Sequence, residues 1–186
     1  MRVIAGRARH IALTAPAGLN TRPTTDRIKE TLFNMIQPFI AGANFLDLFS
    51  GSGAIGIEAL SRGAASCDFV ENERNALKAI EDNLKKTKLD GGHIYRSDVY
   101  SFLSSAGKNK KYDIIFMDPP YDHLFEKKVI EMLAVSECAG PDTLIIFECS
   151  LDTAFDDYLG ELGFDTVKVK TYKTNRHVFI KKKEMI

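Results

Sequence analysis

The chain has 186 residues, 45% of them hydrophobic and 27% charged, which is typical of one globular domain with a sizeable core. No apolar run approaches the length of a membrane span, and residues 1–7 are too few and too basic for a signal peptide, so we expect no membrane attachment. The three cysteines lack metal-ligand spacing and the four histidines are scattered. These features predict reduced thiols, a cytoplasmic location and no metal site.

The formal net charge is zero, but the charge is unevenly distributed along the chain. Residues 1–29 carry six basic side chains against one acidic side chain, and residues 168–186 carry seven against one. The middle of the chain is acidic. Basic ends of this kind suit a polyanionic partner, although lysines on solvated edge strands are an equal alternative for the C-terminal group. For the N-terminal arginines, the fork geometry of the guanidinium favours phosphate contacts.

The first 43 residues predict a small hairpin followed by a helix. Residues 2–5 and 10–14 are expected as two short strands around a turn at Gly6. A helix then begins at Thr24 or Thr25, either of which can cap it, with Asp26 near the positive end of its dipole. Its buried face is predicted from apolar residues at helical spacing: Ile28, Leu32, Met35, Ile36 and Phe39.

From residue 44 onward, strands and helices alternate. The expected strands are 44–48, 67–71, 93–97, 112–118 and 143–149, and the expected helices are 54–62, 75–86, 100–104, 126–134 and 154–162. The segments 164–172 and 177–182 predict a closing hairpin that turns at residues 173–175. This alternation indicates an α/β fold with a mostly parallel sheet and right-handed crossovers.

The turn after the first of these strands contains a glycine pattern. Residues 51–56 read G-x-G-x-x-G, and Glu71 follows about twenty residues later at the end of the next strand. The pattern fits either a nicotinamide dinucleotide or another adenosine cofactor. Asp47 favours S-adenosylmethionine, because a carboxylate beside the loop repels a pyrophosphate and suits an ammonium group. Asp98 is placed to reach the adenine amine. Helix capping is the alternative role for Asp47 and Asp98.

Asp118-Pro119-Pro120-Tyr121 ends the apolar strand 112–118. The prolines must stop the strand, which leaves a carboxylate and an aromatic ring at its carboxyl end. Asp118 and the carbonyl of Pro119 could each accept an N–H of a nucleobase amine, favouring the pyramidal nitrogen that forms during attack on a methyl donor. Tyr121 would stack on the base. The alternative is a plain strand-to-helix turn in which Asp118 caps a helix and Tyr121 packs.

Together these segments resemble the RsmD family of bacterial 16S rRNA guanine-N2 methyltransferases. The resemblance covers most of the chain, and its most specific part is Arg22-Pro23-Thr24-Thr25-Asp26-Arg27. The other matching segments are Arg2-Val3-Ile4-Ala5-Gly6, Leu32-Phe33-Asn34, Asp47-Leu48-Phe49-Ser50-Gly51-Ser52-Gly53, Gly56, Glu58-Ala59, Ser61-Arg62, Glu71 and Asp118-Pro119-Pro120-Tyr121. One departure is His10-Ile11-Ala12, where the family usually has a Gly-Arg pair.

The resemblance implies a Rossmann-like methyltransferase fold with a seven-stranded sheet, in a single domain 1–186 made of an N-terminal extension (1–43) and a core (44–186). It implies methylation of one guanine in 16S rRNA, with the small ribosomal subunit or its assembly intermediate as partner. The expected cofactor residues are Asp47, Phe49, Ser50, Gly51, Ser52, Gly53, Glu71, Asn72 and Asp98. The expected catalytic residues are Asp118, Pro119, Pro120 and Tyr121, and the expected RNA-binding residues are Arg2, Arg7, Arg9, Arg22 and Arg27.

Three alternatives remain open at this point. A DNA adenine or cytosine amino-methyltransferase shares the Asp-Pro-Pro-Tyr turn, but this chain is short for a sequence-reading DNA domain. A nicotinamide-dependent oxidoreductase explains the glycine loop and leaves Asp47 and the two prolines unexplained. A non-catalytic RNA-binding assembly factor keeps the fold, and the intact Asp118–Tyr121 group argues against it.

Overall fold

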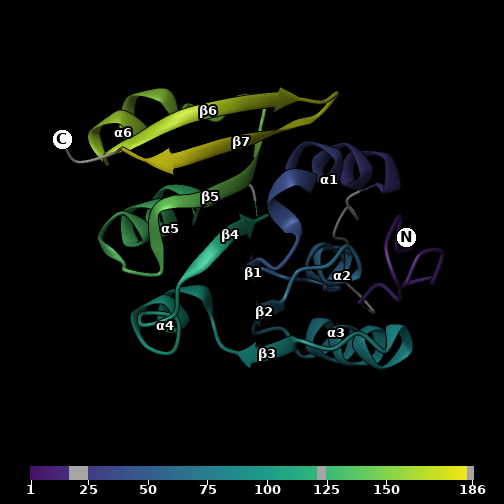
Figure 1. Cartoon of the computed structure of the whole chain (residues 1–186). Helices are drawn as coiled ribbons and strands as arrows, with labels where there is room; N and C mark the ends of the chain where they lie inside the picture. The colour runs from purple at the N-terminus through teal and green to yellow at the C-terminus, as the bar shows by residue number, and fades with distance from the viewer. Residues whose placement is uncertain (17–24, 121–124, 184–186) are drawn as a thin grey trace.

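The computed structural model describes residues 1–16, 25–120 and 125–183. Within these residues seven strands form one sheet in the order β3-β2-β1-β4-β5-β7-β6, with helices on both faces (Figure 1). The strands are β1 (Asn44–Leu48), β2 (Ser66–Glu71), β3 (Gly92–Arg96), β4 (Tyr112–Met117), β5 (Ala139–Ser150), β6 (Phe164–Thr171) and β7 (Asn175–Lys182). The helices are α1 (Asp26–Ile40), α2 (Ala54–Ser61), α3 (Arg74–Thr87), α4 (Val99–Ser104), α5 (Phe125–Val135) and α6 (Asp156–Glu161).

The strand order places a topological switch point between β1 and β4. Strands β1, β2 and β3 run outward to one edge, and β4 and β5 run outward in the other direction, all in parallel. Only β7 is antiparallel to its neighbours β5 and β6. Open α/β sheets bind ligands beyond the carboxyl ends of the strands at such a switch point. The predicted class, a mostly parallel seven-stranded α/β sheet, is therefore confirmed.

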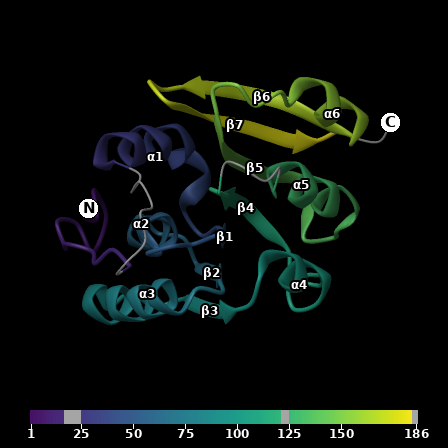
Figure 2. The same ribbon diagram turned by 180° about the vertical axis from the view of Figure 1, so that it is seen from behind.

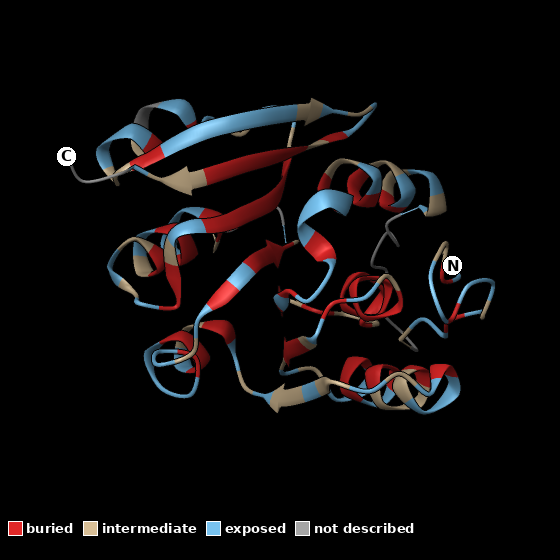
Figure 3. Cartoon of the chain, viewed as in Figure 1, coloured by how far each residue is buried: buried red, intermediate tan, exposed pale blue. Residues whose placement is uncertain are grey.

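Two layers of helices cover the sheet. Helices α1, α2 and α3 pack on one face and α4, α5 and α6 on the other, as the two opposite views show (Figures 1 and 2). The central strands β1, β4 and β5 are buried almost throughout, whereas β6 is largely exposed at the sheet edge (Figure 3). None of the helices in the described residues is long and apolar enough to cross a membrane.

The N-terminal hairpin is less regular than two strands. Its only bridge outside the named strands, in the described part of the chain, pairs Arg2 with Ala12. Backbone hydrogen bonds such as that from Val3 N to Ile11 O keep the two arms together. The expected strands 2–5 and 10–14 are thus corrected to one bridge, because the backbone N–H groups of Ile4 and Ala5 donate to the Glu58 carboxylate instead of to a partner strand.

Gly6 brings the hairpin against the end of α2. Its φ is +81°, and a Cβ at this position would lie 1.8 Å from the carbonyl oxygen of Ser61. The hydroxyl of Ser61 donates to the Ala5 carbonyl and accepts from the Ala8 amide. The expected turn at Gly6 is therefore also the point of closest contact with the rest of the fold.

Most expected boundaries agree within two residues, and β5 shows the largest difference. It begins at Ala139 instead of residue 143, and its register with β4 shifts between the pairs Tyr112–Ala139 and Ile114–Leu144. The turn-forming residues Gly140-Pro141-Asp142 lie inside this irregularity. The strand accommodates them as a bulge. At the N-terminus of α1, Thr25 is the cap, accepting from the Ile28 amide, and Thr24 lies outside the described residues.

Candidate functional site

The glycine loop connects β1 to α2 at the switch point. Gly51 and Gly53 have φ values of +55° and +74°, and Phe49 is also left-handed at +59°. The hydroxyl of Ser50 fixes the loop from inside by donating to the Asp47 carbonyl, at 2.6 Å. A Cβ on Gly51 would meet nothing within 4 Å, so the backbone of the loop is open to a ligand on that side.

Asp47 lies beneath this loop and is 1% exposed. Its Oδ2 accepts from the backbone N–H of Gly56 at 3.0 Å, in the first turn of α2. Burial raises the pKa of the Asp47 carboxyl well above its usual value, and the nearby charge of Glu71 raises it further. The α2 helix can approach so closely because Gly56 has no side chain; a Cβ there would lie 2.4 Å from the Phe69 ring.

Glu71 ends β2 and holds the loop from the other side. Its Oε2 accepts from the Gly51 amide at 2.9 Å, and its Oε1 accepts from the amides of Asn72 and Glu73. Asn72 is exposed and Ser52 half-buried. The structure therefore brings Asp47, Glu71 and the glycine loop together, as expected.

Asp98 follows β3 and is the N-cap of α4. Its Oδ1 accepts from the Ser101 amide at 3.0 Å, and the hydrogen bonds from the Ser101 side chain and then from this amide lower the pKa of the Asp98 carboxyl. The side chain is exposed. The structure therefore shows the capping role directly, and the adenine contact stays a prediction.

Asp118 follows directly after β4, next to Asp47 at the end of β1. Burial raises the pKa of the Asp118 carboxyl well above its usual value, and the charges of Glu148 and Asp47 raise it further. Pro119 is buried and Pro120 exposed. Tyr121 lies outside the described residues.

Two buried polar residues near Asp118 were not predicted from the sequence. Glu148 is 6% exposed on β5 and His177 is 0% exposed on β7, and the Nε2 of His177 lies 3.0 Å from the Oε2 of Glu148. A signal was available, because Glu148 is a charged residue that follows the apolar run 144–147 directly, inside the predicted strand 143–149. A charged residue inside a buried strand is rare unless it is paired.

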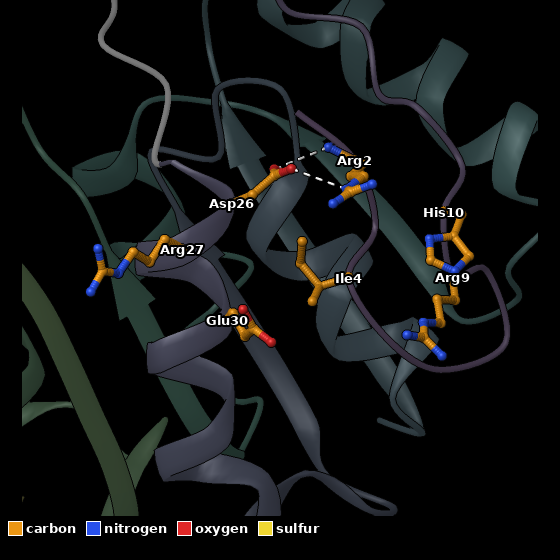
Figure 4. Close-up of a pocket in the computed structure, with 7 residues that line it drawn as sticks. All are labelled: Arg2, Ile4, Arg9, His10, Asp26, Arg27 and Glu30. Carbon is orange, nitrogen blue, oxygen red and sulfur yellow. Dashed lines mark hydrogen bonds and ion pairs between the residues drawn. The ribbon is translucent and has the colours of Figure 1, made fainter.

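The arginine-rich surface lies between the N-terminal hairpin and α1. A cavity of about 220 Å³ opens there, away from the glycine loop, and Figure 4 shows the residues around it: Arg2, Ile4, Arg9, His10, Asp26, Arg27 and Glu30. Arg2 donates to Asp26 from its backbone amide and pairs with it through Nε at 3.2 Å. Arg7 and Arg9 are exposed, and Arg22 lies outside the described residues. The cavity thus gathers three of the five predicted RNA-binding arginines.

The carboxylates at the switch point fit S-adenosylmethionine better than a dinucleotide. Two carboxylates border the glycine loop: Glu71 accepts from the Gly51 amide, and Asp47 is buried beneath the loop. Such a border attracts a cationic ligand and repels a pyrophosphate. Among the described residues, no group of three or more histidine, cysteine, aspartate or glutamate side chains could hold a metal ion.

The fold and this site define the class of Rossmann-like S-adenosylmethionine-dependent methyltransferases. The family model described as "Conserved hypothetical protein 95" matches residues 1–181. Ribosomal RNA small subunit methyltransferase D of Escherichia coli K12 is 37% identical over 152 residues, which are 82% of this chain and 76% of that protein. The chain belongs to this family, the RsmD family of ribosomal RNA small subunit methyltransferases.

Solved structures agree with this assignment. The yhhF protein of Escherichia coli has a TM-score of 0.85 and 30% identity, and the match covers 100% of this chain and 99% of that one. The ribosomal protein L11 methylase of Lactobacillus delbrueckii subsp. bulgaricus has a TM-score of 0.72 at 16% identity, covering 91% and 84% of the two chains. The second likeness concerns the fold alone.

Proposed function

We propose that this chain transfers a methyl group from S-adenosylmethionine to the exocyclic N2 amine of one guanine in 16S rRNA of the small ribosomal subunit or its assembly intermediate. The observation that carries the proposal is the position of Asp118. Its carboxyl follows β4 at the switch point, beside the strand whose end carries Asp47 and the glycine loop. A methyl donor held by that loop and an amine held by Asp118 would therefore meet.

The cofactor would be held by the residues around the loop. The open backbone at Gly51 allows close approach, Glu71 lies where a ribose is bound in this fold class, and Asp47 is the proposed acceptor for the ammonium group. When bound, S-adenosylmethionine supplies an electrophilic methyl group whose bonding electrons remain with the leaving sulfur. Phe49, Ser50, Ser52, Gly53, Asn72 and Asp98 complete the proposed set.

The amine would be oriented by fixed acceptors. Asp118 accepts one N–H and the Pro119 carbonyl accepts the other, so that the nitrogen lone pair points at the methyl group. Asp118 then accepts the proton that the methylated amine loses. Tyr121, whose position the structure does not describe, is proposed to stack on the guanine ring. Pro120 stiffens the turn that presents these groups.

The RNA would be held by the N-terminal arginines. Arg2, Arg9 and Arg27 border the cavity beside α1, Arg7 is exposed on the same hairpin, and Arg22 belongs to the same proposed set. Guanidinium groups bind phosphate oxygens in pairs of hydrogen bonds. This surface would therefore position the RNA while the Asp118 turn takes up the extruded base.

The experiment is methyl transfer from labelled S-adenosylmethionine to 16S rRNA and to 30S particles from cells that lack the protein. We expect label in one guanine with the wild type and no label with the matched-volume variant Asp118→Asn, while both bind the cofactor equally in calorimetry. Duplex DNA and NAD serve as control substrates. Label in DNA would support an amino-methyltransferase of another class, and tight rRNA binding without label would support an assembly factor.

A further inference from the structure

The last two strands of the sheet carry a run of like charge. Residues 166–183 contain seven basic side chains and no acidic one, although the whole chain is formally neutral. Four of the seven donate to backbone carbonyls or lie close to Asp165 at the amino end of β6: Arg176, Lys181, Lys182 and Lys183. The other three lie along the second half of β6 and in the turn that follows it: Lys168, Lys170 and Lys173, here called the β6 lysines.

The β6 lysines have no acidic partner within the described part of the chain. Lys168 and Lys173 are exposed, and neither forms an ion pair there. The ammonium of Lys170 lies 6.0 Å from the centre of the Tyr172 ring, a contact that does not neutralise its charge. Neighbouring cations repel each other, so this cluster costs folding free energy unless an anion balances it.

Two of the β6 lysines point to the sheet face that α1 covers. Registered residues of antiparallel strands share a face, and the partners of Lys168 and Lys170 on β7 are Phe179 and His177. Phe179 packs in the same core cluster as α1 and the N-terminal hairpin, and His177, two residues earlier on the strand, shares its face. The β6 lysines and the N-terminal arginines therefore belong to the same side of the sheet.

The turn after β6 also lies at the same end of the sheet as Asp118. Strand β6 is antiparallel to β7, which is antiparallel to β5, so β6 runs in the direction of β4 and β5 (Figure 1). Asp118 follows β4, and Lys173 follows β6 three strand spacings further along the sheet, a lateral distance of about 14 Å. An RNA strand whose base lies at Asp118 can reach this turn within a few nucleotides.

We propose that the β6 lysines bind phosphate groups of the rRNA strand next to the target guanine. This inference rests on the proposed methylation of 16S rRNA and adds a second contact surface to it. The N-terminal hairpin packs against α2 and α3 on the β1–β2 side of β4, whereas β6 lies on the other side. The RNA would therefore be held on both sides of Asp118.

Protection of an edge strand against pairing is the alternative role for lysines on β6. That role accounts for charges on the strand itself. It accounts neither for Lys173, which lies in the turn beyond the strand, nor for the lack of any acidic residue between 166 and 183. A polyanionic partner accounts for both features.

The test compares two triple variants that lose the same charge. The first replaces the β6 lysines: Lys168→Gln, Lys170→Gln and Lys173→Gln. The control replaces three exposed lysines that precede the amino ends of β3 and β4, away from the carboxyl end where Asp118 lies: Lys85→Gln, Lys108→Gln and Lys111→Gln. Filter binding of 16S rRNA at several salt concentrations gives the slope of log K against log salt for each variant and for the wild type.

Loss of three phosphate contacts should reduce this slope by about 2.1, and binding at 0.15 M salt should weaken by about 50-fold. The control should keep the wild-type slope. At saturating rRNA the first variant should keep the wild-type kcat, because its substitutions lie outside the proposed cofactor and base sites. An unchanged slope in the first variant, or an equal reduction in both variants, would overturn the proposal. Self-association of the first variant with an unchanged slope would overturn it in favour of edge protection.

A measurement on the wild type keeps the proposal testable if the first variant does not fold. Lysines are acetylated with and without bound 16S rRNA, and the products are quantified by mass spectrometry. Lys168 and Lys173 should react more slowly in the complex, whereas Lys108 and Lys111 should react at the same rate; equal rates at all four overturn the proposal. Binding of rRNA with this protection but without methyl transfer would contradict the proposed function and support the contact surface.

Discussion

The ammonium of Lys29 lies 3.2 Å from the Oε2 of Glu58, and both side chains are completely buried. Burial lowers the pKa of Lys29, and the charge and hydrogen bond of Glu58 oppose this effect. Glu58 also accepts from Arg62 and from the amides of Ile4 and Ala5. One carboxylate on α2 therefore joins α1 and the N-terminal hairpin.

Replacing Glu58 should destabilise the protein strongly. Glu58→Gln leaves Lys29 buried without an opposite charge, and breaking a buried pair in this way costs about 3–5 kcal/mol. Urea denaturation measures the loss. Asp82→Asn, which breaks the exposed pair with Lys78, is the control and should leave the free energy of unfolding essentially unchanged. Equal effects of the two substitutions would contradict a structural role for the buried pair.

The close contact of the hairpin at Gly6 predicts that substitution of Gly6 destabilises the protein more than substitution of Gly42. Gly6→Ala and Gly42→Ala both place a Cβ at a left-handed φ, +81° and +75°, which costs about 1–2 kcal/mol. Only the Cβ at Gly6 would overlap a backbone atom, the Ser61 carbonyl, whereas the Cβ at Gly42 meets nothing within 4 Å. Gly6→Ala should therefore cost about 1–3 kcal/mol more in denaturant unfolding. Similar losses would mean that the hairpin moves away freely.

The raised pKa of Asp118 predicts that this residue lowers stability at neutral pH. Between the unfolded value of 3.8 and the raised folded pKa, the folded chain binds more protons than the unfolded chain. The contribution of Asp118 to the free energy of unfolding therefore falls as pH rises through this window, by at most about 1.4 kcal/mol per pH unit. Asp118→Asn should be more stable than the wild type at pH 7, and the difference should vanish below pH 3.8. A variant less stable at pH 7 would contradict this sign.

The exposed hairpin arginines should determine the salt dependence of RNA binding. Each phosphate contact on single-stranded RNA contributes about 0.7 to the slope of log K against log salt, so Arg7→Gln with Arg9→Gln should reduce that slope by about 1.4. The matched control replaces Lys108 and Lys111, two exposed cations that precede the amino end of β4, whereas Asp118 follows its carboxyl end. Filter binding of rRNA between low and high salt gives both slopes. An unchanged slope in the arginine variant would exclude Arg7 and Arg9 as phosphate ligands.

The sequence predicted those features that follow from local periodicity and from turn residues. The strand 44–48 agrees with β1 at both ends, because an apolar run is bounded there by Gly42 and the glycine loop. The position of Asp118 followed from two prolines that must end β4. These features depend on residues close together in the chain.

Contacts between distant segments could not be predicted in the same way. The sequence indicated only that Glu58 belongs to a family motif and that Lys29 is one of the N-terminal basic residues. Their ion pair forms only when α1 and α2 pack together. Glu148 and His177 lie opposite each other because β5 pairs with β7, and 28 residues separate them in the chain. No local sequence pattern specifies this register. The bulge in β5 is a third case, since pairing with β4 extends the strand to Ala139, four residues before its predicted start at 143.

The docking of the hairpin also has a consequence for biosynthesis. Thr14 is held on both backbone atoms by the amide of Asn83, which also donates to the Ser52 carbonyl in the glycine loop. Residues 1–14 leave the ribosome before Glu58, Ser61 and Asn83, which are added about 45 to 70 residues later, on the order of several seconds at usual translation rates. During that delay Val3 and Leu13, both buried in the finished protein, have no core to enter. The nascent hairpin therefore exposes these apolar side chains until α2 and α3 have been made.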